Sequence, residues 1–338
     1  MNSPVNNPAS NQPSSDTLSE ILAAVRLKGA VFFEVEASAP WVAEAPNAAL
    51  VAPALTSPSS KLKGAHVMEY HVITHGACWA TIVGHDIAPI ELAAGDVIAF
   101  PQGDAHILSS APGMRGKIAD HAFEFADGLP VPLSLNLDGG AERTHVVCGF
   151  LSCDPRPFNP LIEALPPVLH LRGSQASNWL DGFMRFALLE ASEKRLGASQ
   201  ILSRLGEVMF ADMVRRYVES LPEDSRGWLG GLRDRHVGRA LKLMHAQPAR
   251  GWTLDELAKQ SGLSRSSFAE RFTGFVGTPP MQYLQRWRLQ LAASQLRDGA
   301  TSIAAVAAQT GYESEAAFSR AFKRVLGEPP AEWRDRAS

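Results

Sequence analysis

Residues 267–280 of the chain read SFAERFTGFVGTPP, and residues 317–330 read AFSRAFKRVLGEPP. Both segments contain the pattern Phe-x3-Phe-x4-Gly-x-Pro-Pro, and every matched position is displaced by 50 residues. Upstream of each segment an Ala-x3-Gly pattern recurs at a displacement of 49, first from Ala258 and then from Ala307. A self-match of this length indicates a duplicated structural unit.

The first copy has the pattern of two short helices joined by a turn of a few residues. Thr253, with Glu256 three residues later, is typical of a capping box that starts a helix. Gly262 predicts the end of that helix, and Ser264 predicts the N-cap of the next one. The two phenylalanines of the second helix share one face, and the small Ala258 lets the two helices cross closely. This is the layout of a helix-turn-helix, whose second helix offers its outer N-terminal residues to the major groove of DNA.

The second copy repeats this layout, with Ser302 as a cap, Gly311 in the turn and a second helix from about Glu313 to Leu326. Between the copies, residues 281–296 have a helical pattern and contain neither Gly nor Pro. A helix of that length spans about 24 Å, so it can hold two reading units roughly one turn of DNA apart. A helical bundle without a DNA-binding role is the alternative, and the duplication with its rigid connector favours DNA binding.

Charge is distributed unevenly along the chain. From Arg233 to the C-terminus there are 16 Lys and Arg against 10 Asp and Glu, whereas the whole chain has a formal charge of -3. Basic residues gathered at one end favour a negatively charged partner, most often nucleic acid. Because no apolar run of about 18 residues and no signal-peptide pattern is present, we expect a cytoplasmic protein without a membrane partner.

The segment from Trp252 to Trp333 resembles the DNA-binding domain of the AraC/XylS family of transcription regulators. The resemblance lies in the Gly-x-Pro-Pro after each second helix and in Gly311-Tyr312, which is similar to the Gly-Phe of the family. It implies an all-α domain of two helix-turn-helix units that binds specific double-stranded DNA. It also implies that the groove is read by Ser266, Ser267 and Glu270 in the first unit and by Glu315, Ala316, Ser319 and Arg320 in the second.

Arg320 is the preferred base reader, because a guanidinium can bond O6 and N7 of guanine together. Glu270 can accept from cytosine N4, or it can instead orient Arg265 or Arg271. Phosphate contacts, which add salt-dependent affinity without reading sequence, are assigned to Arg265, Arg271, Lys323 and Arg324. For each single Arg, a solvated surface charge is the alternative.

The N-terminal half has a β pattern. Residues 1–16 are rich in Asn, Ser and Pro and predict a disordered tail. From residue 17 onwards, short β-like runs separated by turn residues predict a sandwich or barrel. The runs are Ala30–Val35, Met68–Thr74, Cys78–Val83, Val97–Phe100 and His145–Leu151.

Residues 95–106 have the spacing G-x5-P-x-G-x2-H of the second cupin motif, so residues 17–170 resemble a cupin-like sensor domain. In the first cupin motif His71 is present, but Ile73 stands where a second His is expected and no Glu follows at the usual interval. His75 lies on the same strand face, so His71, His75 and His106 are candidates to bind an effector or a metal ion. The missing carboxylate favours a barrel without metal, with histidines satisfied internally or exposed at the barrel mouth.

Beyond a Pro-rich stretch at 155–167 the apolar period changes from two to about 3.6 residues. A mostly apolar stripe on a helix of about 20 residues contains Ile201, Leu205, Val208, Met209, Asp212, Met213 and Tyr217. Helices within residues 171–221 either cap the barrel or form a dimer contact. Residues 222–232 predict a linker into the DNA-binding domain at 233–338. We expect a homodimer, because paired DNA half-sites are common.

The cysteines are Cys78, Cys148 and Cys153, too few for a disulfide framework. Cys78 and Cys148 are candidates for redox sensing, a property that some regulators of the resembled family have. A reactive thiol needs a lowered pKa and access to solvent, but His75 and His145, each three residues before a cysteine, lie on the opposite strand face. Buried inert thiols are therefore the favoured interpretation.

Taken together, the patterns favour a transcription regulator whose N-terminal domain receives an unidentified small-molecule or redox signal. No enzymatic activity and no cofactor are expected, and a contact with RNA polymerase is left open. A cupin metalloenzyme fused to a DNA-binding module is an alternative that needs a complete set of metal ligands. A protein that binds only other proteins would require the basic repeat to be a coincidence.

Overall fold

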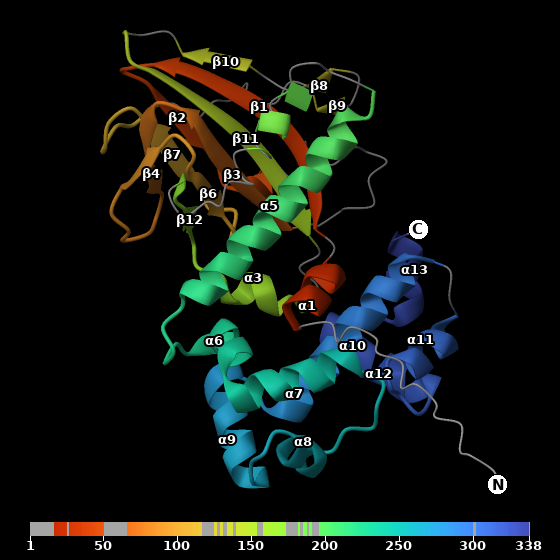
Figure 1. Cartoon of the computed structure of the whole chain (residues 1–338). Helices are drawn as coiled ribbons and strands as arrows, with labels where there is room; N and C mark the ends of the chain where they lie inside the picture. Colours follow the sequence, from red (N-terminus) through yellow and green to blue (C-terminus); the bar gives the residue numbers. More distant parts are fainter. Residues whose placement is uncertain are drawn as a thin grey trace, which may run out of the picture.

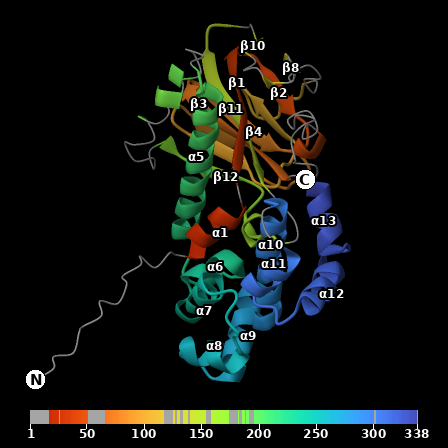
Figure 2. The ribbon, with the colours of Figure 1, turned by 90° about the vertical axis from the view of Figure 1, so that its right-hand side faces the viewer.

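The computed structural model describes residues 17–25, 27–50, 66–116, 125–126, 129–130, 134–137, 140–153, 158–173, 182, 185–187, 189–190, 196–299 and 302–337. The predicted tail, residues 1–16, lies outside the described residues. Figures 1 and 2 show two lobes, an upper one built on β-sheets and a lower one built of helices. The predicted fold class, a cupin-like barrel followed by an all-α domain, is confirmed.

Two sheets form the upper lobe. The six-stranded sheet has the order β10 (Ser134–Leu137), β1 (Lys28–Ser38), β11 (Arg143–Cys153), β3 (His66–His75), β6 (Val97–Phe100) and β12 (Leu169–Leu171). The four-stranded sheet has the order β2 (Val42–Ala45), β7 (His106–Ser109), β4 (Ala77–Ile82) and β5 (Ile90–Ala93). A short hairpin of β8 (Phe125–Ala126) and β9 (Leu129–Pro130) forms a third sheet. Each of the five predicted β runs overlaps one of these strands.

Alternate residues of β3 face opposite sides of the six-stranded sheet, as a strand requires. Val67 and Ile73 belong to the apolar cluster between the two sheets, together with Leu108 of β7. Met68 and Tyr70 belong to a different cluster on the outer side of the sheet. The alternation therefore places Glu69 and His71, which lie between Val67 and Ile73, on the inner face.

The long helix α5 (Ala198–Ser220) runs along the outer face of the six-stranded sheet (Figure 1) and contacts β1, β11 and β12. It therefore caps the barrel, which was one of the two alternatives. The predicted stripe is only half right: Met209 and Met213 are buried, but Ile201 and Val208 are exposed. Asp212 lies within the buried side of the helix and pairs with Arg216, with 2.6 Å between Oδ2 and Nε.

The lower lobe consists of α6 (Gly227–Arg233), α7 (Arg235–Ala246), α8 (Leu254–Gln260), α9 (Arg265–Val276), α10 (Pro280–Arg297), α11 (Ile303–Gln309), α12 (Glu315–Leu326) and α13 (Pro330–Ala337). The prediction of a linker at residues 222–232 is wrong, because α6 buries Trp228 and Leu229. Its glycines serve close packing: a Cβ on Gly230 would lie 2.1 Å from the carbonyl oxygen of Ser225. None of the described helices is long and apolar enough to cross a membrane.

Helix α10 connects two hydrophobic cores. Tyr283 and Trp287 in its first half belong to the core shared with α1, α5 and the outer face of the barrel, whereas Leu289 and Leu296 belong to a separate core around α11, α12 and α13. The first helix-turn-helix thus shares a continuous hydrophobic core with the barrel lobe, whereas the second has a core of its own with α10 and α13.

Two short helices that the sequence patterns did not predict join the lobes. Helix α1 (Thr17–Val25) contacts α7 and α10, and its Ile21 is fully buried. Helix α3 (Pro160–Ala164) contacts α6. The backbone N–H of Phe158, just before α3, donates to Oε1 of Gln290 in α10 over 3.0 Å, and this hydrogen bond is buried.

Candidate nucleic-acid interface and the histidine cluster of the barrel

The first helix-turn-helix forms as its caps predict. Oγ1 of Thr253 accepts from the backbone N–H of Glu256, and Oγ of Ser264 accepts from the backbone N–H of Ser267. Gly262 has a φ of 73°, a left-handed conformation that turns the chain between α8 and α9. Phe268 and the phenylalanine four residues later are fully buried against α8 and α10, so the opposite face of α9 is turned outward.

On this outward face, the predicted base-reading residues Ser266, Ser267 and Glu270 are all exposed. The neighbouring cations are already paired within the chain. Arg265 pairs with Asp255 over 3.1 Å, and both side chains are about two-thirds exposed. An exposed ion pair of this kind is weak, so Arg265 can exchange Asp255 for a phosphate at little cost.

Arg271 is held more firmly. Its Nε lies 3.0 and 3.1 Å from the two carboxylate oxygens of Asp234, and its Nη2 contacts the same carboxylate. Asp234 is also the N-cap of α7, accepting from the backbone N–H groups of His236 and Val237. Partial burial raises the pKa of Asp234, but the hydrogen bonds from Arg271 and from these backbone groups outweigh burial and leave that pKa below its usual value. This pairing favours a structural role for Arg271 over the predicted phosphate contact.

The second helix-turn-helix repeats the geometry with Ser302 and Ser314 as N-caps, and α12 begins at Glu315, two residues later than expected. Of the predicted residues on α12, Glu315, Ala316, Arg320, Lys323 and Arg324 are exposed, and Ser319 is half-buried. Among the described residues no acidic side chain forms an ion pair with Arg320. Its guanidinium is thus available to a ligand outside the chain.

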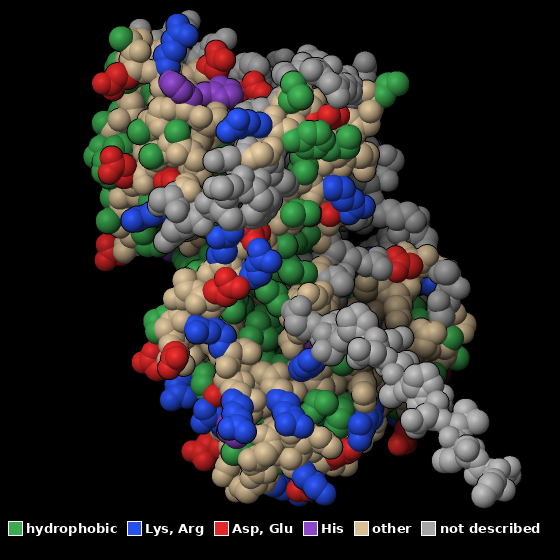
Figure 3. Space-filling model, in the orientation of Figure 1, with side chains coloured by type: hydrophobic (Ala, Val, Ile, Leu, Met, Phe, Trp, Pro, Cys, Tyr) green, Lys and Arg blue, Asp and Glu red, His purple; other side chains and the backbone are tan. Residues whose placement is uncertain are grey.

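The two units are fixed relative to each other by a close contact. The turn of the second unit at Gly311 lies against the loop before α8, where a Cβ on Gly311 would be 2.7 Å from the carbonyl oxygen of Ala249. Arg288 of α10 donates to the carbonyl oxygens of Pro248 and Arg250 on either side of Ala249, each over 2.7 Å. Lys and Arg side chains gather over the lower part of this lobe in Figure 3, as the charge asymmetry predicted.

Inside the barrel, three potential metal ligands converge. Glu69 and His71 extend from β3, and His106 extends from β7 in the other sheet. The two Nε2 atoms of His71 and His106 lie 2.7 Å apart, and the carboxylate oxygens of Glu69 lie 3.7 and 3.8 Å from them. All three side chains are buried.

The expectation that His75 joins this cluster is wrong. His75 is exposed at the end of β3, where a register shift opposite Val146 interrupts the pairing with β11. Residues four apart on a strand are about 13 Å from each other, too far for His71 and His75 to hold one ion, whereas Glu69 is only two residues from His71. The carboxylate precedes the histidine here, so a search for a Glu after it missed Glu69.

Burial controls the protonation of these groups. It lowers the pKa of His71 well below its usual value and lowers the pKa of His106 to about 4, so both imidazoles are neutral near pH 7. Burial also raises the pKa of Glu69 to about 8. A neutral imidazole is the form that binds a metal ion.

The cysteines are buried, free thiols. Burial raises the pKa of Cys78 and of Cys153 to about 12, and it raises the pKa of Cys148 well above its usual value. Cys148 lies beside the cluster, with its Sγ 2.8 Å from Nδ1 of His71. High pKa values and burial support the interpretation of inert core thiols over that of redox sensors.

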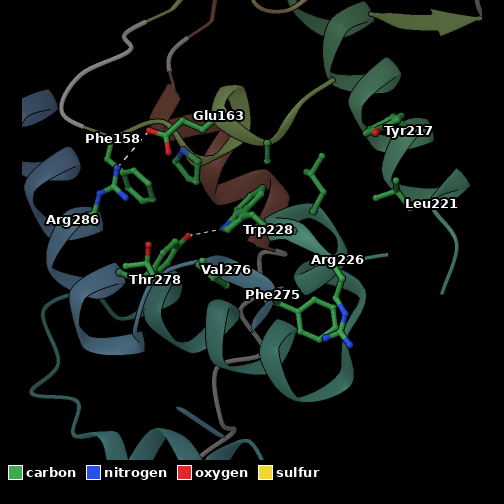
Figure 4. A pocket seen from close by; sticks show the side chains of 16 residues that line it. Phe158, Glu163, Tyr217, Leu221, Arg226, Trp228, Phe275, Val276, Thr278 and Arg286 are labelled. Carbon is green, nitrogen blue, oxygen red and sulfur yellow. Dashed lines mark hydrogen bonds and ion pairs between the residues drawn. The ribbon is translucent and has the colours of Figure 1, made fainter. Parts of the chain in front are cut away.

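A cavity of about 350 Å³ lies where the two lobes meet, between α3, the end of α5, α6 and the junction of α9 with α10. Figure 4 shows Arg286 between Phe158 and Glu163: its guanidinium lies 4.0 Å from the Phe158 ring centroid and 3.5 Å from the carboxylate. The ring of Tyr283 meets the Phe158 ring edge-on, with centroids 5.5 Å apart, and its hydroxyl accepts from Nε1 of Trp228 over 3.0 Å. The cavity is therefore lined by both lobes, with aromatic surfaces and cationic side chains.

Comparison with known proteins assigns both lobes. Residues 16–219 match the family model described as Cupin, and residues 257–336 match the model described as Helix-turn-helix domain. The chain is 34% identical over 270 residues to an AraC-like transcription regulator of Streptomyces lividans, covering 79% of this chain and 86% of the relative. It is 31% identical over 279 residues to the HTH-type transcriptional regulator AlkR of Acinetobacter baylyi, covering 79% of this chain and 87% of the relative.

Among solved structures, an AraC-type transcriptional regulator of Chromobacterium violaceum matches with 27% identity and a TM-score of 0.29, covering 30% of this chain and 90% of that chain.

Proposed function

The chain belongs to the AraC-like transcription regulators with an N-terminal cupin domain, and on this premise we propose that both of its helix-turn-helix units read one DNA site under the control of a signal received by the barrel. The DNA-binding role follows from the family. The residue assignments, the signal and the assembly are the parts proposed here.

The main support for the proposal is that α9 and α12 each expose one face to solvent while α10 connects them rigidly. Helices α9 and α12 both bury their phenylalanines and expose their N-terminal turns, and α10 with its 18 residues connects them over about 27 Å. The contact between Gly311 and Ala249 adds a second restraint on their relative orientation. Two fixed units suit two successive major grooves on one face of the duplex.

Arg320 provides the test. Arg320→Ala is expected to weaken binding to the specific site by about 5- to 150-fold, because a bidentate contact to guanine contributes about 1–3 kcal/mol of discrimination. Arg320→Lys should restore charge but not the bidentate geometry, and should recover only part of the affinity. Arg143→Ala, which removes an exposed arginine at the start of β11 in the barrel lobe, is the matched control and should bind like the wild type.

Fluorescence anisotropy with a selected site and with a scrambled duplex measures these affinities. Equal specific affinity of Arg320→Ala and the wild type would contradict the assignment of Arg320.

The signal is proposed to pass through the junction of the lobes. Support comes from the Phe158–Gln290 hydrogen bond, from the packing of α1 on α7 and α10, and from the cavity that both lobes line. A small molecule that binds differently to two docking states of the lobes would shift their populations and so change the presentation of the first reading unit. The buried thiols favour a small ligand over thiol oxidation as the signal.

A homodimer is part of the proposal. Ile201 and Val208 on the outer side of α5 are 38% and 54% exposed, with the half-buried Leu205 between them, and they offer an apolar strip to a second copy. The mass of a monomer in light scattering, both with and without DNA, would contradict a homodimer.

A further inference from the structure

We propose that Glu69, His71 and His106 bind one divalent transition-metal ion inside the barrel. The site is separate from the DNA-binding surface, and the inference holds or fails independently of the proposed function. It also reverses the expectation of a metal-free barrel, which depended on the absence of a carboxylate near His71.

The donor atoms already have the spacing of a coordination shell. Around an ion with bonds of about 2.0–2.1 Å, neighbouring donors lie about 2.9–3.4 Å apart in octahedral or tetrahedral geometry. The observed separations among the two Nε2 atoms and the carboxylate, 2.7, 3.7 and 3.8 Å, fall on both sides of this range. Two imidazoles and one carboxylate are a ligand set that zinc and ferrous iron both accept.

The remaining nitrogen of each histidine has a hydrogen-bond partner. Nδ1 of His106 lies 2.9 Å from the carbonyl oxygen of Asp104, so it carries the proton and leaves Nε2 with a free lone pair. Nδ1 of His71 lies 2.8 Å from Sγ of Cys148. Metal-binding histidines typically donate this second N–H to a fixed acceptor, which sets the tautomer and the ring orientation. If both rings donate through Nδ1, their Nε2 lone pairs face each other at 2.7 Å and need a cation between them.

A metal-free arrangement is the competing explanation. The Cys148 thiol would donate to Nδ1 of His71, and Nε2–H of His71 would donate to Nε2 of His106. In that arrangement the Glu69 carboxyl is buried 3.7 and 3.8 Å from the two Nε2 atoms, and no Lys or Arg pairs with it among the described residues. A divalent ion instead balances the ionised carboxylate.

The surroundings exclude solvent from the ligands. The ring of Phe100 stacks on His106 with centroids 3.7 Å apart and an interplanar angle of 11°, and it meets His71 edge-on at 6.0 Å. His71, His106 and Glu69 are 3%, 1% and 4% exposed. Three protein ligands leave at least one coordination position for water or another small ligand.

The test is metal stoichiometry on the full-length, tag-free protein. After stripping with a chelator, the chain is dialysed against Zn²⁺, Fe²⁺ without oxygen, or Mg²⁺, and bound metal is measured by mass spectrometry. We expect one equivalent of Zn²⁺ or Fe²⁺ and none of Mg²⁺. Glu69→Gln and His106→Gln should each weaken Zn²⁺ binding by at least about 100-fold, because each removes a direct ligand.

His75→Gln is the matched control, because it removes an exposed histidine from the same strand and should retain one equivalent. X-ray absorption of the wild-type Zn²⁺ form adds a measurement that needs no variant: it should show two imidazoles with oxygen ligands and no sulfur at the Zn–S distance of about 2.3 Å. Less than about 0.1 equivalent of metal, unchanged binding in folded Glu69→Gln and His106→Gln, or a sulfur ligand would each overturn the proposal.

Discussion

Arg271 and Arg320 carry the same charge on corresponding helices, yet their surroundings give them different roles. Arg271 is tied to Asp234, the N-cap of α7, whereas no described acidic side chain forms an ion pair with Arg320. Position on a recognition helix therefore does not by itself identify a DNA contact. The deciding feature is whether the cation already has a partly buried acidic partner within the chain.

The double role of Asp234 leads to a graded stability prediction. Asp234→Ala removes both the cap and the partner of Arg271 and should destabilise the helical lobe by about 1–3 kcal/mol. Asp234→Asn keeps an oxygen that can accept from the backbone of α7 but loses the charge, so it should cost less. Urea denaturation followed by circular dichroism gives the order. Equal losses for the two variants would show that the cap contributes nothing.

Substitutions of Lys323 and Arg271 distinguish a cation that contacts DNA phosphate from a cation that stabilises the fold. Lys323 is exposed on α12, and Lys323→Ala should weaken binding to all DNA sequences and reduce the slope of log K against log salt by about one. Arg271→Ala should leave that slope unchanged while lowering stability. A salt slope reduced equally by both substitutions would restore Arg271 as a phosphate contact.

At the scale of elements, two glycines with similar backbone conformations differ in what surrounds them. Gly277 ends α9 with a φ of 73° and has nothing within 4 Å of a Cβ, whereas Gly311 has a φ of 81° and approaches Ala249 closely. Gly277→Ala should cost only the left-handed penalty of about 1–2 kcal/mol. Gly311→Ala adds a backbone clash and should also weaken two-unit DNA binding, because the second unit must move away from the first.

Thermal unfolding and anisotropy on the two alanine variants measure both effects. If Gly311→Ala behaves like Gly277→Ala in both assays, the contact between the units has no role in their orientation.

The elements that local chemistry specifies were predictable from sequence. Thr253, Ser264 and Ser302 begin helices because their hydroxyl oxygens accept from backbone N–H groups three residues on, and that signal lies within one turn. Helices α1 and α6 were missed because their burial depends on partners far along the chain. The buried face of α5 was misplaced for the same reason, since its side chains pack on strands that the helix sequence does not specify.

The cluster in the barrel was half predictable. His106 follows a turn pattern that fixes its place, and His71 lies on a recognisable strand. Glu69 was missed because it meets His106 only when β3 and β7 lie in two facing sheets. No local sequence pattern predicts that arrangement. His75 was wrongly included because alternation gives the side of a strand but not the distance along it.

At the scale of the whole molecule, the two lobes share a buried polar link as well as an apolar core. Gln290, 1% exposed, accepts from the backbone of Phe158. Gln290→Leu leaves that N–H without an acceptor and should weaken docking of the lobes by about 1–3 kcal/mol. If the barrel controls DNA binding through this junction, the DNA affinity of the variant should change although the Gln290 side chain is buried and is not exposed to DNA. Unchanged DNA affinity together with a lowered midpoint of unfolding would show that docking of the lobes stabilises the protein but does not control DNA binding.

The most direct measurement of the central claim is selection of bound fragments from random DNA by the purified full-length protein, with wild type and Arg320→Ala in parallel. The account predicts a motif of two blocks with centres about 10–10.5 base pairs apart, and it predicts that Arg320→Ala loses a guanine preference in one block while the other stays unchanged. A single block, or two blocks whose base preferences do not respond to Arg320→Ala, would contradict the account of two reading units on one rigid support.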